Sequence, residues 1–210
     1  MSIYQLKPRF QSLLRPAVKR MHVLGITANQ VTLFTCAISL ALGLWLFFAA
    51  PPAAAFAWIS VWMLLRMVFN AVDGMLAREH GQQTHLGAFL NELTDVLSDA
   101  ALYLPFALVA PFSAFWVGTV IVLAGMSEFA GALGATIGAT RRYDGPLGKS
   151  DRAFVFGLLA LYIATGAALP GWTSWLMPLL AGLTAWTITN RIRQAIAEAT
   201  VRQAATTSKV

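Results

Sequence analysis

The chain has 210 residues, of which 58% are hydrophobic and 11% are charged, and its mean hydropathy is +0.65. About a quarter of the residues in soluble domains are charged, so this composition excludes an ordinary soluble domain. The net charge of +6 would also suit a nucleic-acid-binding protein,. Because membrane-length apolar runs recur along the chain, we expect anionic lipid headgroups and no nucleic acid as the partner of this charge.

The apolar runs predict an all-α polytopic membrane protein with about six transmembrane helices. These helices are expected over residues 28–50, 54–79, 86–109, 114–140, 153–169 and 172–190. Residues 1–26 are predicted to form an N-terminal juxtamembrane amphipathic helix at the interface, 27–200 the transmembrane domain, and 201–210 a C-terminal cytoplasmic tail. A basic flank that only fixes the topology would explain residues 1–26 equally well.

Basic residues gather in four places: before the first run, after the second, between the fourth and fifth, and after the last. The remaining turns, near Pro51, Pro111 and Pro170, carry no charge. By the positive-inside rule, both termini should face the cytoplasm. We therefore expect an integral protein of the bacterial inner (cytoplasmic) membrane.

Polar residues interrupt the second and third apolar runs at helical spacing. The first group includes Asn70 and Asp73, and the second includes Asn91 and Asp95. A charged group in the centre of a bilayer costs roughly 2.5–3.5 kcal/mol on insertion scales, so such residues by default indicate a functional site. Each group falls on one side of its helix, and two consecutive antiparallel helices can bring these sides face to face.

This pattern resembles the signature of the CDP-alcohol phosphatidyltransferases, DxxDGxxARx8GxxxDxxxD. The positions that match at the required spacing are Asp73, Gly74, Ala77, Arg78, Gly87 and Asp95. Asn70 and Asn91 stand where the family has its first and third acidic residues. In this respect the chain is similar to a proteobacterial branch of the family with the same two asparagines.

The resemblance implies a phospholipid-synthesising transferase. It would move a phosphatidyl group from CDP-diacylglycerol, a membrane lipid, to a soluble alcohol or phospho-alcohol and release CMP, with Mg²⁺ or Mn²⁺ as cofactor. It further implies that Asp95 is the catalytic base and that Asp73 and Asp95 bind metal. The amide oxygens of Asn70 and Asn91 can complete the metal site without adding charge, and Glu92 is an additional candidate ligand. A homodimer is also possible by resemblance.

The same resemblance assigns a nucleotide surface and an acceptor surface. The nucleotide surface comprises Asp73, Gly74, Ala77, Arg78 and Gly87, with Asn29 and Thr32 at the start of the first span. Thr27 is a plausible N-cap, and capping alone would also explain that segment. The acceptor residues are the polar and basic ones between the fourth and fifth spans: Arg141, Arg142, Lys149, Ser150 and Arg152. The positive-inside rule is the alternative explanation for their charge.

Three charged residues lie deeper than the signature. Arg66, Asp99 and Glu128 are each expected roughly 18–20 Å from the cytoplasmic edge, at 1.5 Å per helical residue. A guanidinium at that depth needs a partner. We predict that Arg66 pairs with Asp99, Glu128 or both and clamps three spans together. A deep solvent cavity or an acidic relay is the functional alternative.

The two asparagines favour a second hypothesis. With fewer carboxylates, the chain would be a non-catalytic relative that binds CDP-lipid and regulates or scaffolds lipid synthesis. A transporter that uses the polar residues as an ion path is a more distant alternative.

Overall fold

The computed structural model describes residues 3–207, and every regular element among them is a helix. The α-helices are α1 (Ile3–Val23), α2 (Ala28–Ala49), α3 (Ala57–Glu79), α4 (His85–Tyr103), α5 (Ala114–Leu133), α6 (Lys149–Ala164) and α7 (Leu176–Thr207). Short 3-10 turns are η1 (Ala53–Phe56), η2 (Leu104–Leu108), η3 (Gly134–Ile137) and η4 (Gly171–Trp175). The all-α prediction is confirmed for the described part of the chain.

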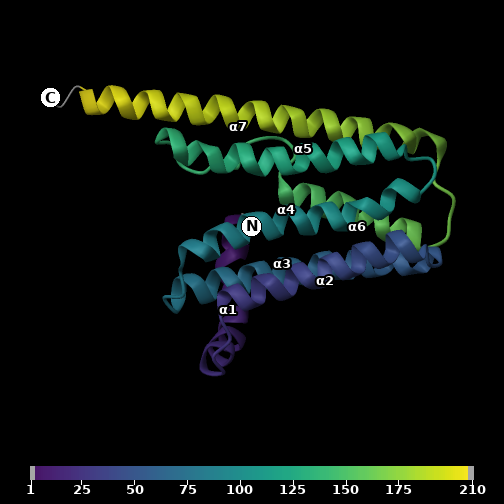
Figure 1. The fold of residues 1–210 in the computed structure, drawn as a ribbon, viewed down its shortest axis with the longest axis horizontal. Helices are drawn as coiled ribbons and strands as arrows, with labels where there is room; N and C mark the ends of the chain where they lie inside the picture. Colours follow the sequence, from purple (N-terminus) through teal and green to yellow (C-terminus); the bar gives the residue numbers. More distant parts are fainter. Residues whose placement is uncertain (1–2, 208–210) are drawn as a thin grey trace.

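Helices α2 to α7 run roughly along one axis, whereas α1 lies at a steep angle to them (Figure 1). Helix α2 packs against α3 and α4, α6 packs against α3, and α5 lies between α4 and α7. Aromatic rings fill the centre, where Tyr103 stacks on Phe156 with 3.9 Å between centroids. Both rings are fully buried, so this stack joins α4 to α6 inside the bundle.

Three helical segments of the described chain are long and apolar enough to cross a membrane. They are Ala28–Ala49, Ala53–Glu79 and Ala114–Ile137. The chain is therefore an integral membrane protein. Helix α4 carries several charged side chains, and the spans predicted at α4, α6 and α7 stay predictions, as does the total of about six.

The segment before the first span is helical and is fixed to α3. Val18 is fully buried in a small apolar cluster with Val72 and Leu76 of α3. Arg15 forms an ion pair with Glu79 at 3.0 Å. Contact of α1 with the membrane interface stays a prediction.

The predicted N-cap of the first span is confirmed. The backbone N–H of Gln30 donates to Thr27 Oγ1 at 3.2 Å, and the backbone N–H of Thr27 donates to the Gln30 side chain at 2.9 Å. At the other end of the chain, α7 stays helical through Thr207, so most of the predicted tail 201–210 is helix. Residues 1–2 and 208–210 lie outside the described residues.

The buried Arg66 links α3 to α4. Its guanidinium is paired with Asp99, and it also donates to Asp95 Oδ1 at 3.2 Å and to the Asp95 carbonyl at 3.1 Å. The sequence suggested two partners for Arg66, and in the structure Asp99 is the one of these two that forms an ion pair with it. Glu128 instead contacts other arginines, described below.

Arg66→Met should strongly destabilise the protein, because Asp99 would stay buried without its partner. Breaking one side of a buried pair costs about 3–5 kcal/mol. Adding Asp99→Leu should recover part of this loss, since both charges are then absent. Tryptophan fluorescence during unfolding in detergent gives the unfolding midpoint of each variant, and the order of these midpoints tests the prediction.

Arg15→Met is the matched control, because it breaks an exposed pair and should change the midpoint little,. A double variant no more stable than Arg66→Met would contradict the clamp.

Gly43 lets α2 approach α4 closely. A Cβ at this position would overlap with the backbone carbonyl of Ala101. Gly43→Ala should therefore destabilise the protein, whereas Gly118→Ala, in open space on α5, should be neutral or stabilising by about 0.5–1 kcal/mol,. Unfolding midpoints of the two variants test this, and equal midpoints would mean that α2 and α4 separate easily.

Candidate functional site

The polar residues of α3 and α4 line one cavity of about 440 Å³. Asn70 and Asp73 come from α3, and Asn91 and Asp95 come from α4. The two helices are joined by a short turn, so their polar sides meet at the same end of the bundle. The structure thus brings together the four signature positions with acidic or amide side chains.

The two signature carboxylates of the cavity, Asp73 and Asp95, have different surroundings. Asp73 Oδ2 accepts a hydrogen bond from Thr32 Oγ1 at 2.8 Å and forms no ion pair within residues 3–207. Asp95 contacts the ammonium of Lys149 as well as the Arg66 guanidinium. Asp73 is therefore the carboxylate with the more available negative charge, while Asp95 is held in place by two cations.

A second cavity of about 410 Å³ adjoins the first. The two share Asp73, Gly74, Arg78 and Asn91. The second is further lined by predicted nucleotide residues, namely Asn29, Thr32, Ala77 and Gly87, and by Glu92. All residues predicted for the nucleotide surface thus lie together.

Gly87 makes room for the side chain of Asn29. A Cβ at Gly87 would lie 2.7 Å from Asn29 Oδ1 and 2.9 Å from Thr84 Oγ1. Thr84 is the N-cap of α4, and its hydroxyl accepts the backbone N–H of Gly87 at 2.8 Å. The signature glycine therefore keeps α2 and the start of α4 in contact at the floor of the second cavity.

The predicted acceptor residues divide into two groups. Arg141, Lys149 and Ser150 line the first cavity. Arg142 instead binds Asp144 and Glu198, each at 2.7 Å, and Arg152 is fully buried; neither lines the cavity. The hydrogen bond from Arg142 lowers the pKa of Asp144, which keeps this loop pair ionised at neutral pH.

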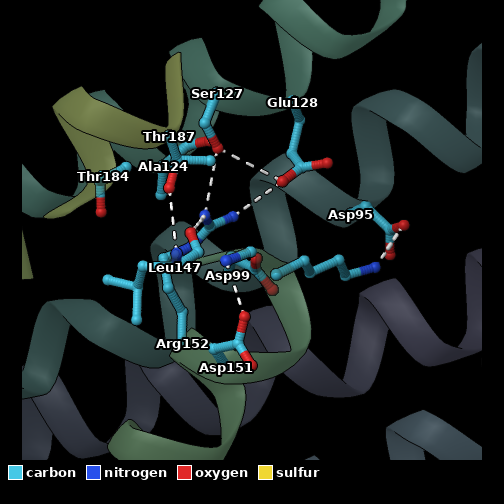
Figure 2. Close-up of polar contacts among 12 residues, drawn as sticks. Asp95, Asp99, Ala124, Ser127, Glu128, Leu147, Asp151, Arg152, Thr184 and Thr187 are labelled. Atoms are coloured by element: carbon cyan, nitrogen blue, oxygen red, sulfur yellow. Dashed lines mark hydrogen bonds and ion pairs between the residues drawn. The ribbon is translucent and has the colours of Figure 1, made fainter. Parts of the chain in front are cut away.

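Glu128 of α5 lines the first cavity and is in contact with three arginines, of which Figure 2 shows Arg152. Arg152 Nη2 donates to its Oε1 at 2.9 Å, and Arg191 Nη1 lies 3.4 Å from the same oxygen. Arg141 Nη2 is 3.6 Å from Oε2, and the Ser127 hydroxyl donates to Oε1 at 3.3 Å. Sequence reasoning missed Arg191, whose only signal was a basic residue just beyond the last apolar run.

The charges that line the first cavity balance. Four are basic and four are acidic: Arg78, Arg141, Lys149 and Arg191 against Asp73, Asp95, Glu128 and Asp151. Without ligands the cavity is therefore formally neutral at pH 7, although four of its residues are cationic.

The donor set fits a divalent metal ion. Two carboxylates and two amides supply oxygen ligands, which Mg²⁺ and Mn²⁺ prefer. Within residues 3–207 no three acidic, histidine or cysteine side chains lie close enough together to hold a metal ion among themselves, so the amides of Asn70 and Asn91 would have to contribute. Glu92, the additional candidate ligand, is paired with Arg141.

The sequence comparison decides the family. Residues 25–186 match the profile described as CDP-alcohol phosphatidyltransferase. The chain belongs to the CDP-alcohol phosphatidyltransferase family. Inner membrane protein YnbA of Escherichia coli is 45% identical over 196 residues, which are 93% of this chain and 97% of that protein. The phosphatidylinositol phosphate synthase of Corynebacterium glutamicum is 32% identical over 93 residues, which are 44% of this chain and 41% of that enzyme.

The fold of this family member is similar to solved structures of phosphatidylinositol phosphate synthase from Mycobacterium tuberculosis. The complex with manganese and citrate superposes with a TM-score of 0.70 at 22% identity, covering 86% of this chain and 87% of the other. The complex with CDP-DAG has the same TM-score and identity and covers 86% and 92%. At this identity the likeness establishes the shared fold.

Gly87→Ala should weaken the binding of CDP by about tenfold or more, because the added methyl group displaces the Asn29 side chain into the second cavity,. Calorimetric titration of the purified chain with CDP measures the change. Gly118→Ala is the matched control, and unchanged affinity in Gly87→Ala would place the nucleotide elsewhere.

Proposed function

We propose that the chain transfers a phosphatidyl group from CDP-diacylglycerol to an alcohol or phospho-alcohol and releases CMP. The supporting observation is the junction of the two cavities at Asp73, Gly74, Arg78 and Asn91. One cavity has the glycine-rich polar surface that suits a nucleotide, and the other contains the two signature carboxylates, Asp73 and Asp95. A pyrophosphate at the junction would be within reach of both.

In this proposal the second cavity receives the cytidine nucleotide. Gly74 and Gly87 leave room for the side chains of Arg78 and Asn29. Ala77 adds a small side chain to the lining, and Asn29 and Thr32 offer polar groups from α2. The guanidinium of Arg78 lies beside Gly74. A Cβ added at Gly74 would be 2.8 Å from Arg78 Nη2. Its position between the cavities suits the pyrophosphate, since guanidinium groups bind phosphate oxygens well.

The acceptor hydroxyl would enter the first cavity beside Asp95. Asp95 accepts the hydroxyl proton as the oxygen attacks the lipid-side phosphorus, and the bond from this phosphorus to the bridging oxygen breaks. The products are the phosphodiester lipid and CMP. Arg66 and Lys149 fix the Asp95 carboxylate, which favours a defined geometry for proton transfer,.

Asp73, Asp95, Asn70 and Asn91 would hold the divalent ion. When bound, Mg²⁺ or Mn²⁺ supplies positive charge that offsets the charge of the pyrophosphate. Asp73 is best suited as the principal ligand, because within residues 3–207 it forms no ion pair and Thr32 orients it.

The membrane placement follows the same proposal. We place the protein in the bacterial inner membrane with both termini in the cytoplasm, where a soluble acceptor can reach the cavity. Residues 27–200 would form the catalytic domain. A homodimer stays a prediction from the family.

Purified chain in lipid–detergent with CDP-diacylglycerol, Mn²⁺ or Mg²⁺ and a panel of alcohols and phospho-alcohols should release CMP. Chelation of the metal should abolish release. Asp95→Asn should reduce it by about a hundredfold or more, because the proton acceptor is lost. Asp144→Asn, which lies outside both cavities, is the matched control and should retain activity.

A non-catalytic CDP-lipid-binding relative is the second candidate, favoured by Asn70 and Asn91. It predicts CDP binding without CMP release across the panel and with both metals. In that case Asn70→Asp with Asn91→Asp, which restores the acidic positions, would be the variant in which to look for gained activity.

A further inference from the structure

The carboxylate of Glu128 occupies the place where an anionic ligand in the first cavity would contact the arginine side chains of the cavity wall. The residue is 6% exposed, lines the cavity and contacts Arg191 and Arg141 as well as Arg152, the arginine shown beside it in Figure 2. Arg152 and Arg191 are themselves 0% and 2% exposed. This is a built cluster in which a side chain of the protein already supplies the anion.

The donors of these arginines are largely committed to the protein. Arg152 Nη1 donates to Ser127 Oγ and to the Leu147 carbonyl, each at 3.1 Å, besides the bond from Nη2 to Glu128. Arg191 donates to the carbonyls of Ser127 and Asp144. Arg141 pairs with Glu92 as well as Glu128. Among the buried side-chain nitrogens of residues 3–207, only Arg141 Nε and Arg152 Nε lack a hydrogen-bond partner, so a phosphate would find few free N–H groups on this wall.

The charge balance of the cavity points the same way. Its basic and acidic lining residues are equal in number, as described above. With one divalent ion and the pyrophosphate of the donor lipid, the formal charge returns to zero. A phosphomonoester acceptor would add about two negative charges beside Glu128, and like charges repel strongly at a poorly solvated site.

We infer that Glu128 selects an uncharged alcohol as the acceptor and excludes phosphorylated alcohols. This inference rests on the proposed transferase function and narrows its acceptor class. The hydroxyls of Ser150 and Tyr143, which line the same cavity, offer neutral hydrogen-bonding groups to such an acceptor. Glu128 thus acts as a specificity-determining residue by filling the anion position with its own carboxylate.

The experiment compares matched acceptors on the full chain in lipid–detergent with CDP-diacylglycerol and Mn²⁺. The pairs are glycerol against glycerol 3-phosphate, and myo-inositol against its 1-phosphate. The wild-type chain should use one of the uncharged alcohols with a kcat/KM about tenfold or more above its phosphate. Glu128→Gln, which keeps the shape and removes the charge, should shift that ratio toward the phosphate by about tenfold or more.

Glu79→Gln is the matched control. Glu79 also binds an arginine, Arg15, but lines neither cavity, so this variant should keep the wild-type preference. A wild-type preference for the phosphorylated acceptor would overturn the inference. A wild-type preference for the alcohol that Glu128→Gln leaves unchanged would remove Glu128 as its cause.

A binding readout separates this inference from the transferase proposal. Titration with inorganic phosphate in the presence of CDP should give no binding to the wild-type chain and measurable binding to Glu128→Gln. If no acceptor gives CMP release, the transferase proposal fails, and this titration alone decides the role of Glu128. Equal phosphate binding by both chains, or binding by neither, would overturn it. If Glu128→Gln does not fold, the wild-type chain alone decides. Phosphate binding by the wild-type chain would then overturn the inference. No phosphate binding, together with a preference for the alcohol, would support it.

Discussion

The contact between Arg66 and the two aspartates of α4 is the constraint on which the site depends. A buried guanidinium is tolerable only when its charge is matched, and Asp99 and Asp95 match it from successive turns of one helix,. This fixes the rotation of α4 relative to α3. Asn91 then shares a cavity with Asn70 and Asp73, and Asp95 is left with one side toward that cavity. The structural pair and the candidate chemistry therefore use the same helix face.

Charge in this protein is organised as a chain of linked pairs. Arg66 connects to Asp95, Asp95 to Lys149 of α6, and the helix of Lys149 carries Arg152, which binds Glu128 of α5. Each ion is therefore held by at least one partner on a different helix. In a low-dielectric interior such a network is stable only if it is nearly complete, which explains why few cations in the cavity are free for a ligand.

The sequence predicted the helical class, the N-cap at Thr27 and the grouping of the signature residues, because these depend on local spacing. It also named Asp99 as a partner for Arg66, since depth in the membrane limits the choice. It did not predict the partners of Glu128 or Lys149. Depth alone allowed Glu128 to reach Arg66, but the packing of α5 between α4 and α7 turns it toward Arg152 and Arg191. Such pairings depend on which helices are neighbours, and spacing along one helix carries no information on that.

The long helix α7 extends past the other helices at one end of the bundle (Figure 1). In the C-terminal part of α7, Glu198 accepts hydrogen bonds from Thr140 and Arg142, which belong to the loop that carries Arg141 and Tyr143 to the cavity. Arg202 reaches the Gly138 carbonyl of the same loop. The loop at the rim of the cavity is thus held by the C-terminal part of α7. A displacement of this part of α7 would therefore also displace the loop that carries Arg141 and Tyr143.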